Sequence, residues 1–358
     1  MPVNPHIRAV ASAFPTHQYQ QIEICRAAQD SLLGAGWAQH PELAAQGKEM
    51  ERLFTASHVA ERQSTIDIND FYQRPRSTGE RMQAYRTGAF ALGKTALASA
   101  ITDIPTESIS DLVSVSCTGY TSPGLDVTLS RELGLSGSVR RVNVGHMGCF
   151  GAMVGIRQCL ASTRAYPGAT AILLCVELCT LHFTPTNDYE VLTSFALFGD
   201  AAAAIVVSSA PDATGPEIVD THCATEFQTA DQMTWNITDQ GFIMTLSPRV
   251  PVSIRRVITK TVEELLAPHG LTRHDIKHWL VHPGGPSILE AVQGKLELTP
   301  EQMEFSWQVL RDHGNCSSAT VLLILEALLA SGRPQPGEWG VMMAFGPGLT
   351  LETCLLRF

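Results

Sequence analysis

The stretch Arg-Arg-Val-Asn-Val-Gly-His-Met-Gly-Cys-Phe-Gly-Ala-Met-Val-Gly-Ile-Arg, residues 140–157, decides how the rest of the chain is interpreted. It predicts a short buried strand with Val142 and Val144, a sharp turn, and a helix whose first turn carries Cys149. A thiol at a helix N-terminus lies near the positive end of the helix dipole, which favours the nucleophilic thiolate. Cys149 is therefore a candidate nucleophile, although a cysteine in this position can also simply pack in a core. Three glycines are expected to leave room for a bulky electrophile near the sulfur: Gly145, Gly148 and Gly151.

Composition narrows the class of protein. The chain has 358 residues and a net charge of −10, which argues against nucleic acid or an anionic membrane as its main partner. Its nine cysteines have neither the spacing of a disulfide framework nor that of a zinc site, so we expect a cytoplasmic protein without a bound metal. The N-terminal residues do not resemble a signal peptide. Glu177 and Asp200 interrupt the longest apolar stretches, so no membrane span is expected.

Apolar segments alternate between strand-like and helix-like patterns. Strands are predicted at 7–14, 111–117 and 171–176, and helices at 19–33 and 79–103. Strands that are flanked by helices favour an α/β architecture.

The chain also contains an internal repeat. The strands predicted at 111–117 and 278–282 are each followed by a Gly/Pro loop, a helix and a turn. The first of these turns is His-Met-Gly-Cys at 146–149, and the second is His-Gly-Asn-Cys at 313–316. An apolar helix is expected to begin at each turn, so the pattern indicates a duplicated α/β unit.

The duplication predicts two halves, residues 1–210 and 211–358, that face each other across a pseudo-twofold axis. Equivalent turns of the two halves then meet at one site. We expect Cys149 from the first half and Asn315 from the second to converge there, with His282 at the end of its own strand.

The sequence resembles the type III polyketide synthases, the chalcone-synthase-like branch of the thiolase superfamily. The resemblance covers nearly the whole chain and implies a thiolase-like α/β fold, with duplicated αβαβα halves in five layers. It also implies a homodimer that uses coenzyme A thioesters as substrates, without a carrier protein or a bound cofactor. It rests on five motifs in the family's order: Gly148–Phe150, Ala196–Asp200, Trp279–Pro286, Gly314–Ala319 and Phe345–Glu352.

By this resemblance Cys149, His282 and Asn315 form a Cys-His-Asn triad, with Phe198 as an aromatic gatekeeper. The residue types suit acyl transfer, because a thiolate is both a nucleophile and a leaving group. His282 can hold the thiolate as an imidazolium partner, and with Asn315 it can stabilise the enolate of a decarboxylated malonyl unit. Phe198 offers an apolar wall that disfavours the malonyl carboxylate.

Each of these residues also has a structural interpretation. His282 can be a strand-end histidine that bonds to backbone, Asn315 can be a helix N-cap, and Phe198 can belong to the core. The joint occurrence of the residues favours the catalytic interpretation. His146 and His313, which flank the two turns, are interpreted as scaffold.

Departures from the plant members of the family suggest the substrate. Cys179 and His182 stand where those enzymes line the starter pocket with threonine. Met244 replaces a cavity phenylalanine, although a different alignment gap places Phe242 there. Soft, adaptable side chains favour an aliphatic starter over an aromatic one. Trp235 falls near the same wall and is expected to limit the volume.

Three further positions are carried over from the family. Ser122 aligns with a loop residue that reaches into the neighbouring subunit's cavity, and Ser317 with a cavity serine. Of three basic positions expected at the coenzyme A entrance, Arg52 alone matches, so Lys48 or Arg62 is expected to compensate, because the phosphates need a positive partner.

These observations predict a type III polyketide synthase, an acyltransferase. It is expected to condense malonyl-CoA or methylmalonyl-CoA units onto an aliphatic acyl-CoA and to cyclise the product to an alkylpyrone or alkylresorcinol. One alternative is a single condensation of the β-ketoacyl synthase III type, although His282-Pro-Gly-Gly differs from the usual histidine motif of that enzyme. Others are a polyketide built from malonyl-CoA alone or from an aromatic starter, and an inactive homologue that serves as a binding subunit.

Overall fold

The apolar strand segments pair into one mixed sheet in the computed structural model, which describes residues 4–358. The strand order is β11-β12-β13-β8-β1-β7-β6-β4-β5. A single residue pair, His6 with Glu217, joins β1 to β8, so the sheet divides there into two parts. The first part contains β1 (His6–Ala13), β4 (Ile109–Ser116), β5 (Arg140–Gly145), β6 (Thr170–Leu178) and β7 (Asp200–Ser208). The second contains β8 (Glu217–Thr225), β11 (Ile276–Val281), β12 (Trp339–Gly346) and β13 (Thr350–Arg357).

The two parts of the sheet have the same internal arrangement. In the first, β4 and β6 are parallel, and β7 is antiparallel to both β6 and β1. In the second, β11 and β12 are parallel, and β13 is antiparallel to both β12 and β8. This correspondence confirms the duplicated α/β fold that the sequence repeat predicts.

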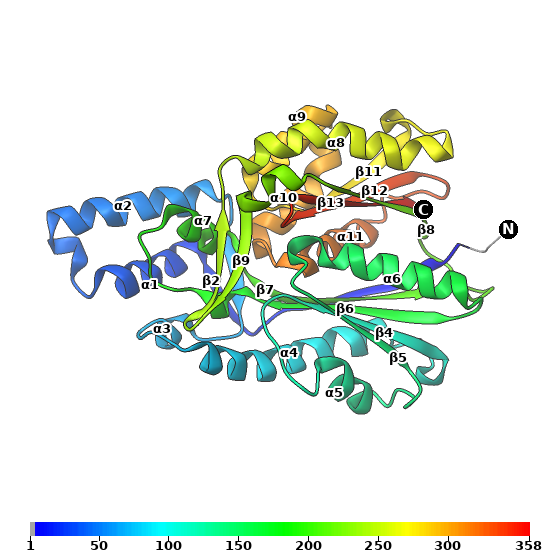
Figure 1. The fold of residues 1–358 in the computed structure, drawn as a ribbon, viewed down its shortest axis with the longest axis horizontal. Helices are drawn as coiled ribbons and strands as arrows, with labels where there is room; N and C mark the ends of the chain where they lie inside the picture. Colours follow the sequence, from blue (N-terminus) through cyan, green and yellow to red (C-terminus); the bar gives the residue numbers. More distant parts are fainter. Residues whose placement is uncertain (1–3) are drawn as a thin grey trace.

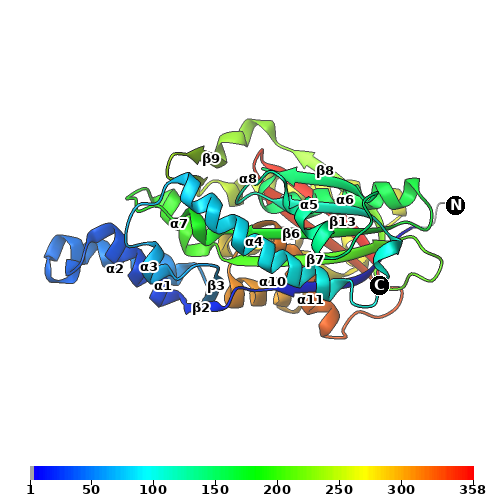
Figure 2. The same cartoon turned by 90° about the horizontal axis from the view of Figure 1, so that it is seen from below.

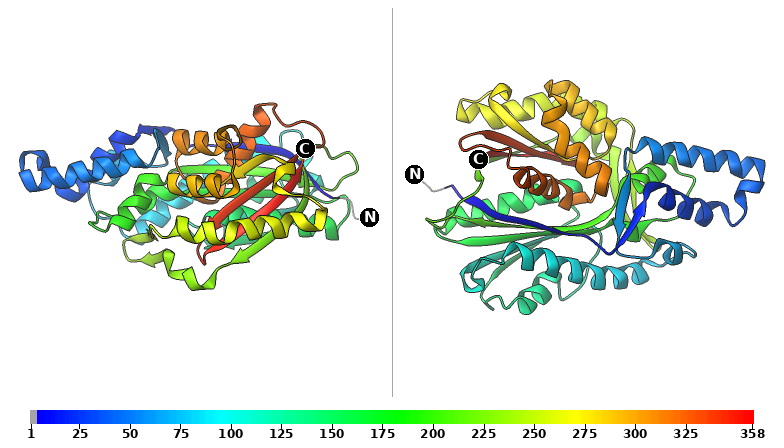
Figure 3. Two further views of the ribbon diagram at one scale, coloured as in Figure 1. Left: turned by 90° about the horizontal axis from the view of Figure 1, so that it is seen from above. Right: turned by 180° about the vertical axis from the view of Figure 1, so that it is seen from behind.

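Helices complete five layers (Figure 1). The outer face of the first sheet is covered by α4 (Thr78–Ala100) and α5 (Leu125–Glu132), and that of the second by α8 (Val250–Leu266), α9 (Pro286–Leu296) and α10 (Pro300–His313). Between the sheets lie α6 (Gly151–Ala165) and α11 (Thr320–Ala330), as the right view of Figure 3 shows. The sequence of α11, TVLLILEALLA, is apolar almost all round because both of its sides face a sheet.

The remaining elements lie at one end of the layered core. Figure 2 shows α1 (Gln21–Leu33) and α2 (Pro41–Ala56) projecting at the end opposite the chain termini. Also at this end are α3 (Ile68–Phe71), α7 (Tyr189–Leu197) and two antiparallel strand pairs, β2 (His17–Gln20) with β3 (Glu61–Ser64) and β9 (Met233–Thr238) with β10 (Gly241–Leu246). Short 3-10 turns occur at Trp37–Gln39, Thr106–Ser108, Gly148–Phe150, Cys179–His182, Phe227–Gln232, Ala267–His269, Arg273–Asp275 and Ser317–Ala319.

Most predicted elements agree with the structure within a few residues, and the predicted strand around Val142 and Val144 is present as β5, but the predicted burial of Val142 is wrong. In the described part of the chain, strand β5 is the last strand of the sheet and pairs only with β4. Val142 is therefore 37% exposed, whereas Val144 is buried. Cys149 lies in the 3-10 turn that precedes α6. Within residues 4–358, every helix is too short or too polar to cross a membrane.

Candidate active site

Cys149 lies in a tight turn, η3 (Gly148–Phe150), between β5 and α6. Gly148 has a φ of +73°, and a Cβ at this position would lie 2.6 Å from Cδ of Pro347. A Cβ on Gly151 would lie 2.7 Å from Val115, and one on Gly145 would lie 3.3 Å from the Tyr120 hydroxyl. The three glycines therefore permit close packing of the turn. That they also leave room for an electrophile at the sulfur stays a prediction.

The structure brings Cys149 and Asn315 together from the two halves. The Cys149 Sγ lies 3.9 Å from both Oδ1 and Nδ2 of Asn315, and both residues are buried. The Asn315 Oδ1 accepts a hydrogen bond of 2.8 Å from the backbone N–H of Ser317 in turn η8 (Ser317–Ala319). This bond fixes the amide plane, so Nδ2 remains as a donor on the side of the sulfur.

Phe198 is joined to Asn315 through the backbone. It follows the last residue of α7 and forms an isolated bridge with Asn315. The Asn315 N–H donates to the carbonyl of Leu197 at 2.8 Å, and the Gly199 N–H donates to the carbonyl of Asn315 at 3.0 Å. Backbone hydrogen bonds thus join the segment of Phe198, the predicted gatekeeper, to the segment that carries the Asn315 amide.

His282 follows β11, and its backbone N–H donates to the carbonyl of Met343 on β12 at 2.9 Å. Its ring is fully buried, and neither ring nitrogen has a hydrogen-bond partner among the described residues. The Cys149 thiol therefore does not hydrogen-bond to His282 in this structure. An unpaired buried polar group costs about 1–3 kcal/mol, so an imidazole kept in this condition is a candidate for a functional group.

Burial sets the charge of both groups. It raises the pKa of the Cys149 thiol to about 12, although hydrogen bonds with Ser317 and Asn315 oppose the rise. Burial also lowers the pKa of His282 to about 3. The resting pair is therefore a neutral thiol and a neutral imidazole. Desolvation therefore has a larger effect on the pKa of the Cys149 thiol than the helix N-terminus, which the sequence suggested as the cause of a thiolate.

Glu177 is a buried group that the sequence analysis did not assign to the site. Its carboxylate accepts hydrogen bonds from the backbone N–H of Cys117 at 3.0 Å, the Thr118 hydroxyl at 2.9 Å and the Ser318 hydroxyl at 2.5 Å. These bonds tie β6 to the end of β4 and to η8. Burial raises the pKa of Glu177 to about 7. A single glutamate in an otherwise apolar strand was the signal that could have identified it.

Several predicted pocket residues meet in one small cavity, which we call the inner cavity. Its volume is about 30 Å³. Both Phe242 and Met244 line it, so the two alternative alignments place a side chain on the same wall. Half of its lining residues carry an aromatic or imidazole ring. The lining includes Cys179, His182, Phe183, Phe195, Phe198, Trp235, Phe242 and Met244.

Two polar side chains of the inner cavity are already hydrogen-bonded. The His182 Nε2 bonds to the carbonyl of Thr118 at 2.7 Å, and its Nδ1 accepts from the N–H of Phe242 at 3.0 Å. Burial lowers the pKa of His182 to about 3, so the ring is neutral. The Trp235 Nε1–H donates to the carbonyl of Cys117 at 2.8 Å. Both residues therefore act as fixed walls in this structure.

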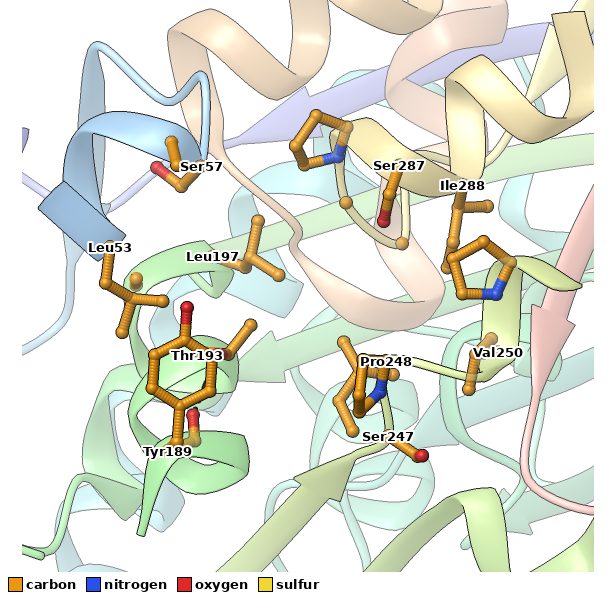
Figure 4. A pocket seen from close by; sticks show the side chains of 17 residues that line it. Leu53, Ser57, Tyr189, Thr193, Leu197, Ser247, Pro248, Val250, Ser287 and Ile288 are labelled. Atoms are coloured by element: carbon orange, nitrogen blue, oxygen red, sulfur yellow. Dashed lines mark hydrogen bonds between the residues drawn. The ribbon is translucent and has the colours of Figure 1, made fainter. Parts of the chain in front are cut away.

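A second cavity of about 250 Å³ lies against the C-terminal end of α7, and we call it the outer cavity (Figure 4). Figure 4 shows side chains of α2 and α7 on one side, and facing them on the other side Ser247, Pro248, Val250, Ser287 and Ile288. No charged side chain of the described chain lines it. Leu197 lines the outer cavity and Phe198 lines the inner one, so the end of α7 separates the two.

The remaining predicted residues lie in different places. Ser317 is buried beside Cys149, whereas Ser122 is exposed and lines neither cavity. Arg52 and Lys48 are exposed on α2, outside the lining of the outer cavity. Arg62 is fully buried and donates to backbone carbonyls, so the prediction that it could meet a coenzyme A phosphate is wrong.

Comparisons with known proteins agree with this architecture. The model of the N-terminal domain of chalcone and stilbene synthases matches residues 9–211, and that of the C-terminal domain matches residues 221–358. A 1,3,6,8-tetrahydroxynaphthalene synthase of Streptomyces peucetius subsp. caesius is 34% identical over 98% of this chain and 93% of the relative. The alpha-pyrone synthesis polyketide synthase-like Pks18 of Mycobacterium tuberculosis is 30% identical, over 87% of this chain and 82% of the relative.

Solved structures give the same result. The crystal structure of PKS-I from the brown alga Ectocarpus siliculosus superposes with a TM-score of 0.91 at 30% identity. The match covers 100% of this chain and 99% of the other. Both halves of the sequence and the whole fold therefore match the same family. The chain belongs to the chalcone and stilbene synthase family, and it is a type III polyketide synthase, an enzyme of the acyltransferase type.

Proposed function

We propose that the enzyme condenses malonyl-CoA units onto a short aliphatic acyl-CoA starter held on Cys149. The observation that carries this proposal is the convergence of the Cys149 thiol and the Asn315 amide, 3.9 Å apart, from the two halves of the fold. The unpaired ring of His282 supports it, because a buried imidazole without partners is available to a substrate.

Loading of the starter requires a proton acceptor, since the Cys149 thiol is neutral at rest. As the sulfur attacks the starter's thioester carbonyl, its proton passes to the neutral ring of His282. The bond between the carbonyl carbon and the coenzyme A sulfur then breaks. Coenzyme A leaves with that proton, and the acyl group remains on Cys149.

Chain extension begins with loss of carbon dioxide from malonyl-CoA. The bond between the carboxylate carbon and the α-carbon breaks, and its electron pair forms an enolate on the thioester oxygen. The Asn315 Nδ2–H and a ring N–H of His282 donate hydrogen bonds to that oxygen. The enolate carbon attacks the acyl group on Cys149, and the thiolate leaves. Phe198 presents an apolar face that favours the neutral carbon dioxide over the carboxylate.

The outer cavity suits the pantetheine arm of coenzyme A. That arm is uncharged and carries amides, and the lining combines apolar residues with the hydroxyls of Ser57, Thr193, Ser247 and Ser287. Arg52 lies next to the lining residue Leu53 on α2 and is exposed, so we assign the coenzyme A phosphates to it. The thioesters are the substrates, and the proposed steps need no bound cofactor or metal.

The inner cavity limits the starter. A volume of about 30 Å³ favours a short chain, and a long one requires Met244 or Trp235 to move. Cyclisation to an alkylpyrone or alkylresorcinol completes the proposal. The similarity to a tetrahydroxynaphthalene synthase favours a second candidate, an aromatic polyketide without an alkyl chain that is built from malonyl-CoA alone.

We also propose that the enzyme is a homodimer joined through β5. This strand leaves one edge unpaired within the described chain and exposes Val142, and such an edge is a template for pairing with a second copy. Ser122, on the loop that follows the neighbouring strand β4, would then lie near the partner subunit.

A panel of starters tests the function. The purified enzyme is given malonyl-CoA or methylmalonyl-CoA with acyl-CoAs from acetyl to long-chain and with one aromatic acyl-CoA, and the products are identified by mass spectrometry. Pyrones or resorcinols are expected only in the reactions that contain a short aliphatic starter. An aromatic polyketide without an alkyl chain, formed from malonyl-CoA in the absence of any starter, favours the second candidate. A single β-ketoacyl product, or none, contradicts both.

A further inference from the structure

Arg62, on β3, is the largest fully buried side chain in the described part of the chain, with 1% exposure. No carboxylate of residues 4–358 lies within ion-pair distance of it. Instead its Nη1 donates to the backbone carbonyls of Phe195, at 2.7 Å, and Phe198, while its Nε and Nη2 have no partner. The buried carboxylate of Asp200 favours the charge from beyond ion-pair distance, but it does not offset the burial, which lowers the pKa of Arg62. A buried charge without a directly paired counter-charge is costly, so its retention points to a specific task.

The charge is present at neutral pH. Burial lowers the pKa of Arg62 to about 10, which still leaves the guanidinium protonated. It lies at the C-terminal end of α7, where backbone carbonyls lack helical donors and the helix dipole is negative. Arg62 thus supplies the donor and the positive charge that this helix end lacks.

The stem of Arg62 packs against the two segments that form the Phe198–Asn315 bridge. A Cβ on Gly314, which precedes Asn315, would lie 2.9 Å from the Arg62 Cδ. A Cβ on Gly199, which follows Phe198, would lie 3.5 Å from the Arg62 Cβ. The side chain therefore bonds to one partner of the bridge, Phe198, and packs against the residue that precedes the other.

We propose that Arg62 is a positioning residue for decarboxylation of malonyl-CoA, acting through the backbone of Phe198. It rigidly orients the Phe198 ring toward the enolate-forming step. Because Phe198 and Asn315 receive their roles from the proposed function, this inference rests on that proposal. Arginine suits the task because its long stem fills the space beside two glycines and brings Nη1 to two fixed carbonyls.

A double-mutant cycle on malonyl-CoA decarboxylation tests this inference, with carbon dioxide release as the readout. Arg62→Gln is expected to lower kcat about 10- to 100-fold, as a misplaced group does, with little change in KM. Starter loading of Cys149, measured by intact mass, is expected to persist. In the Phe198→Ala background the effect of Arg62→Gln is expected to disappear largely, because the ring that it orients is gone.

Arg81→Gln is the matched control. Arg81 is a second buried arginine that donates to backbone carbonyls, those of Leu181 and Arg76, and it has no bond to Phe198. The fold-change in kcat caused by Arg81→Gln is expected to be the same in wild type and in the Phe198→Ala background, so the two effects multiply without coupling. If Arg62→Gln does not fold, Arg62→Lys, which keeps the charge but loses the fork, replaces it in the cycle with the same expected coupling.

Two results overturn the inference in distinguishable ways. If Phe198→Ala slows decarboxylation and the effect of Arg62→Gln multiplies with it, Arg62 acts independently of Phe198, and the proposed function stands without it. If Phe198→Ala leaves decarboxylation unchanged, the proposed role of Phe198 fails, and the role of Arg62 fails with it.

Discussion

The backbone N–H of Asn315, in the second half of the chain, donates to the carbonyl of Leu197, in the first half, at 2.8 Å. This bond places the end of α7 against the turn that carries the Asn315 amide. Cys149 approaches the same amide from a third segment. The candidate site thus depends on contacts between halves, so small backbone shifts at the junction are expected to change its chemistry more than the stability of the fold.

Asn315→Asp removes the amide donor with little change in shape. We expect decarboxylation of malonyl-CoA to fall about 10²- to 10³-fold, the usual loss for an oxyanion donor, while starter loading of Cys149 continues. Carbon dioxide release and intact mass measure the two steps. Asn69→Asp, at an exposed asparagine, is the control and should leave both unchanged. Equal loss of loading and decarboxylation would show that Asn315 does not act specifically on the enolate.

The pKa of Cys149, raised to about 12 by burial, predicts its alkylation profile. The thiolate is the reactive form, so below that pKa each pH unit should increase the rate with iodoacetamide about tenfold. The profile should keep rising beyond the usual cysteine pKa of about 8.5. Mass mapping of alkylated Cys149 across the pH range at which the fold persists measures it. A plateau beginning near pH 6 would instead indicate a resting thiolate–imidazolium pair.

Glu177 predicts a pH dependence of stability. Its pKa is about 7 in the folded state and near 4.5 when unfolded. Between these values the unfolded chain releases a proton that the native state retains, so this group lowers the free energy of unfolding as pH rises. Glu177→Gln removes that penalty while keeping a similar shape. Its stability relative to wild type, from urea unfolding, should therefore be greater at pH 8 than at pH 5. An equal difference at both pH values would contradict the raised pKa.

Met244 predicts starter length. Met244→Ala should enlarge the inner cavity and shift the accepted aliphatic acyl-CoAs toward longer chains, because the side chain lines the wall of a very small space. Cys179→Phe should shorten them. Relative kcat/KM across the starter panel provides the measurement. Ile237→Ala, on the exposed side of the same β9–β10 pair, is the control. An unchanged preference in both cavity variants would remove these residues from the starter site.

The proposed contact between Arg52 and the coenzyme A phosphates predicts how binding depends on the nucleotide. Arg52→Ala should raise KM for acyl-CoA about tenfold, as expected when a hydrogen bond to a charged group is lost. It should leave KM unchanged for the same acyl group on N-acetylcysteamine, which lacks the nucleotide. Arg26→Ala, at an exposed arginine on α1, is the control. A similar rise with both thioesters would assign Arg52 a role other than binding phosphate.

Local sequence patterns predicted the duplicated fold and the meeting of Cys149 with Asn315, because strand, turn and helix signals recur in order in both halves. The edge position of β5 was not accessible in this way. Val142 lies in a pattern that fits a buried strand, and only the order of strands in the sheet exposes it. The division of the chain near residue 210 remains a prediction.

The charge states and the supporting groups of the site depend on tertiary burial. The sequence places Arg62 among polar residues, and only the packing of α7 and the Gly314 turn around it makes it a buried donor. Similarly, the positions of Cys149 and His282 suggested an ion pair, whereas desolvation favours the neutral forms. Such long-range effects have no signature in a local pattern.

The most direct test of the central claim is intact-protein mass spectrometry after acetyl-CoA is mixed with wild type, Cys149→Ala and Cys223→Ala, the last at the exposed cysteine. We predict one added acetyl group in wild type and Cys223→Ala, and none in Cys149→Ala. When malonyl-CoA is then added to all three proteins, only the two that carry an acetyl group are expected to form extended products. An acetyl group retained by Cys149→Ala, or products formed by it at the wild-type rate, would contradict the account.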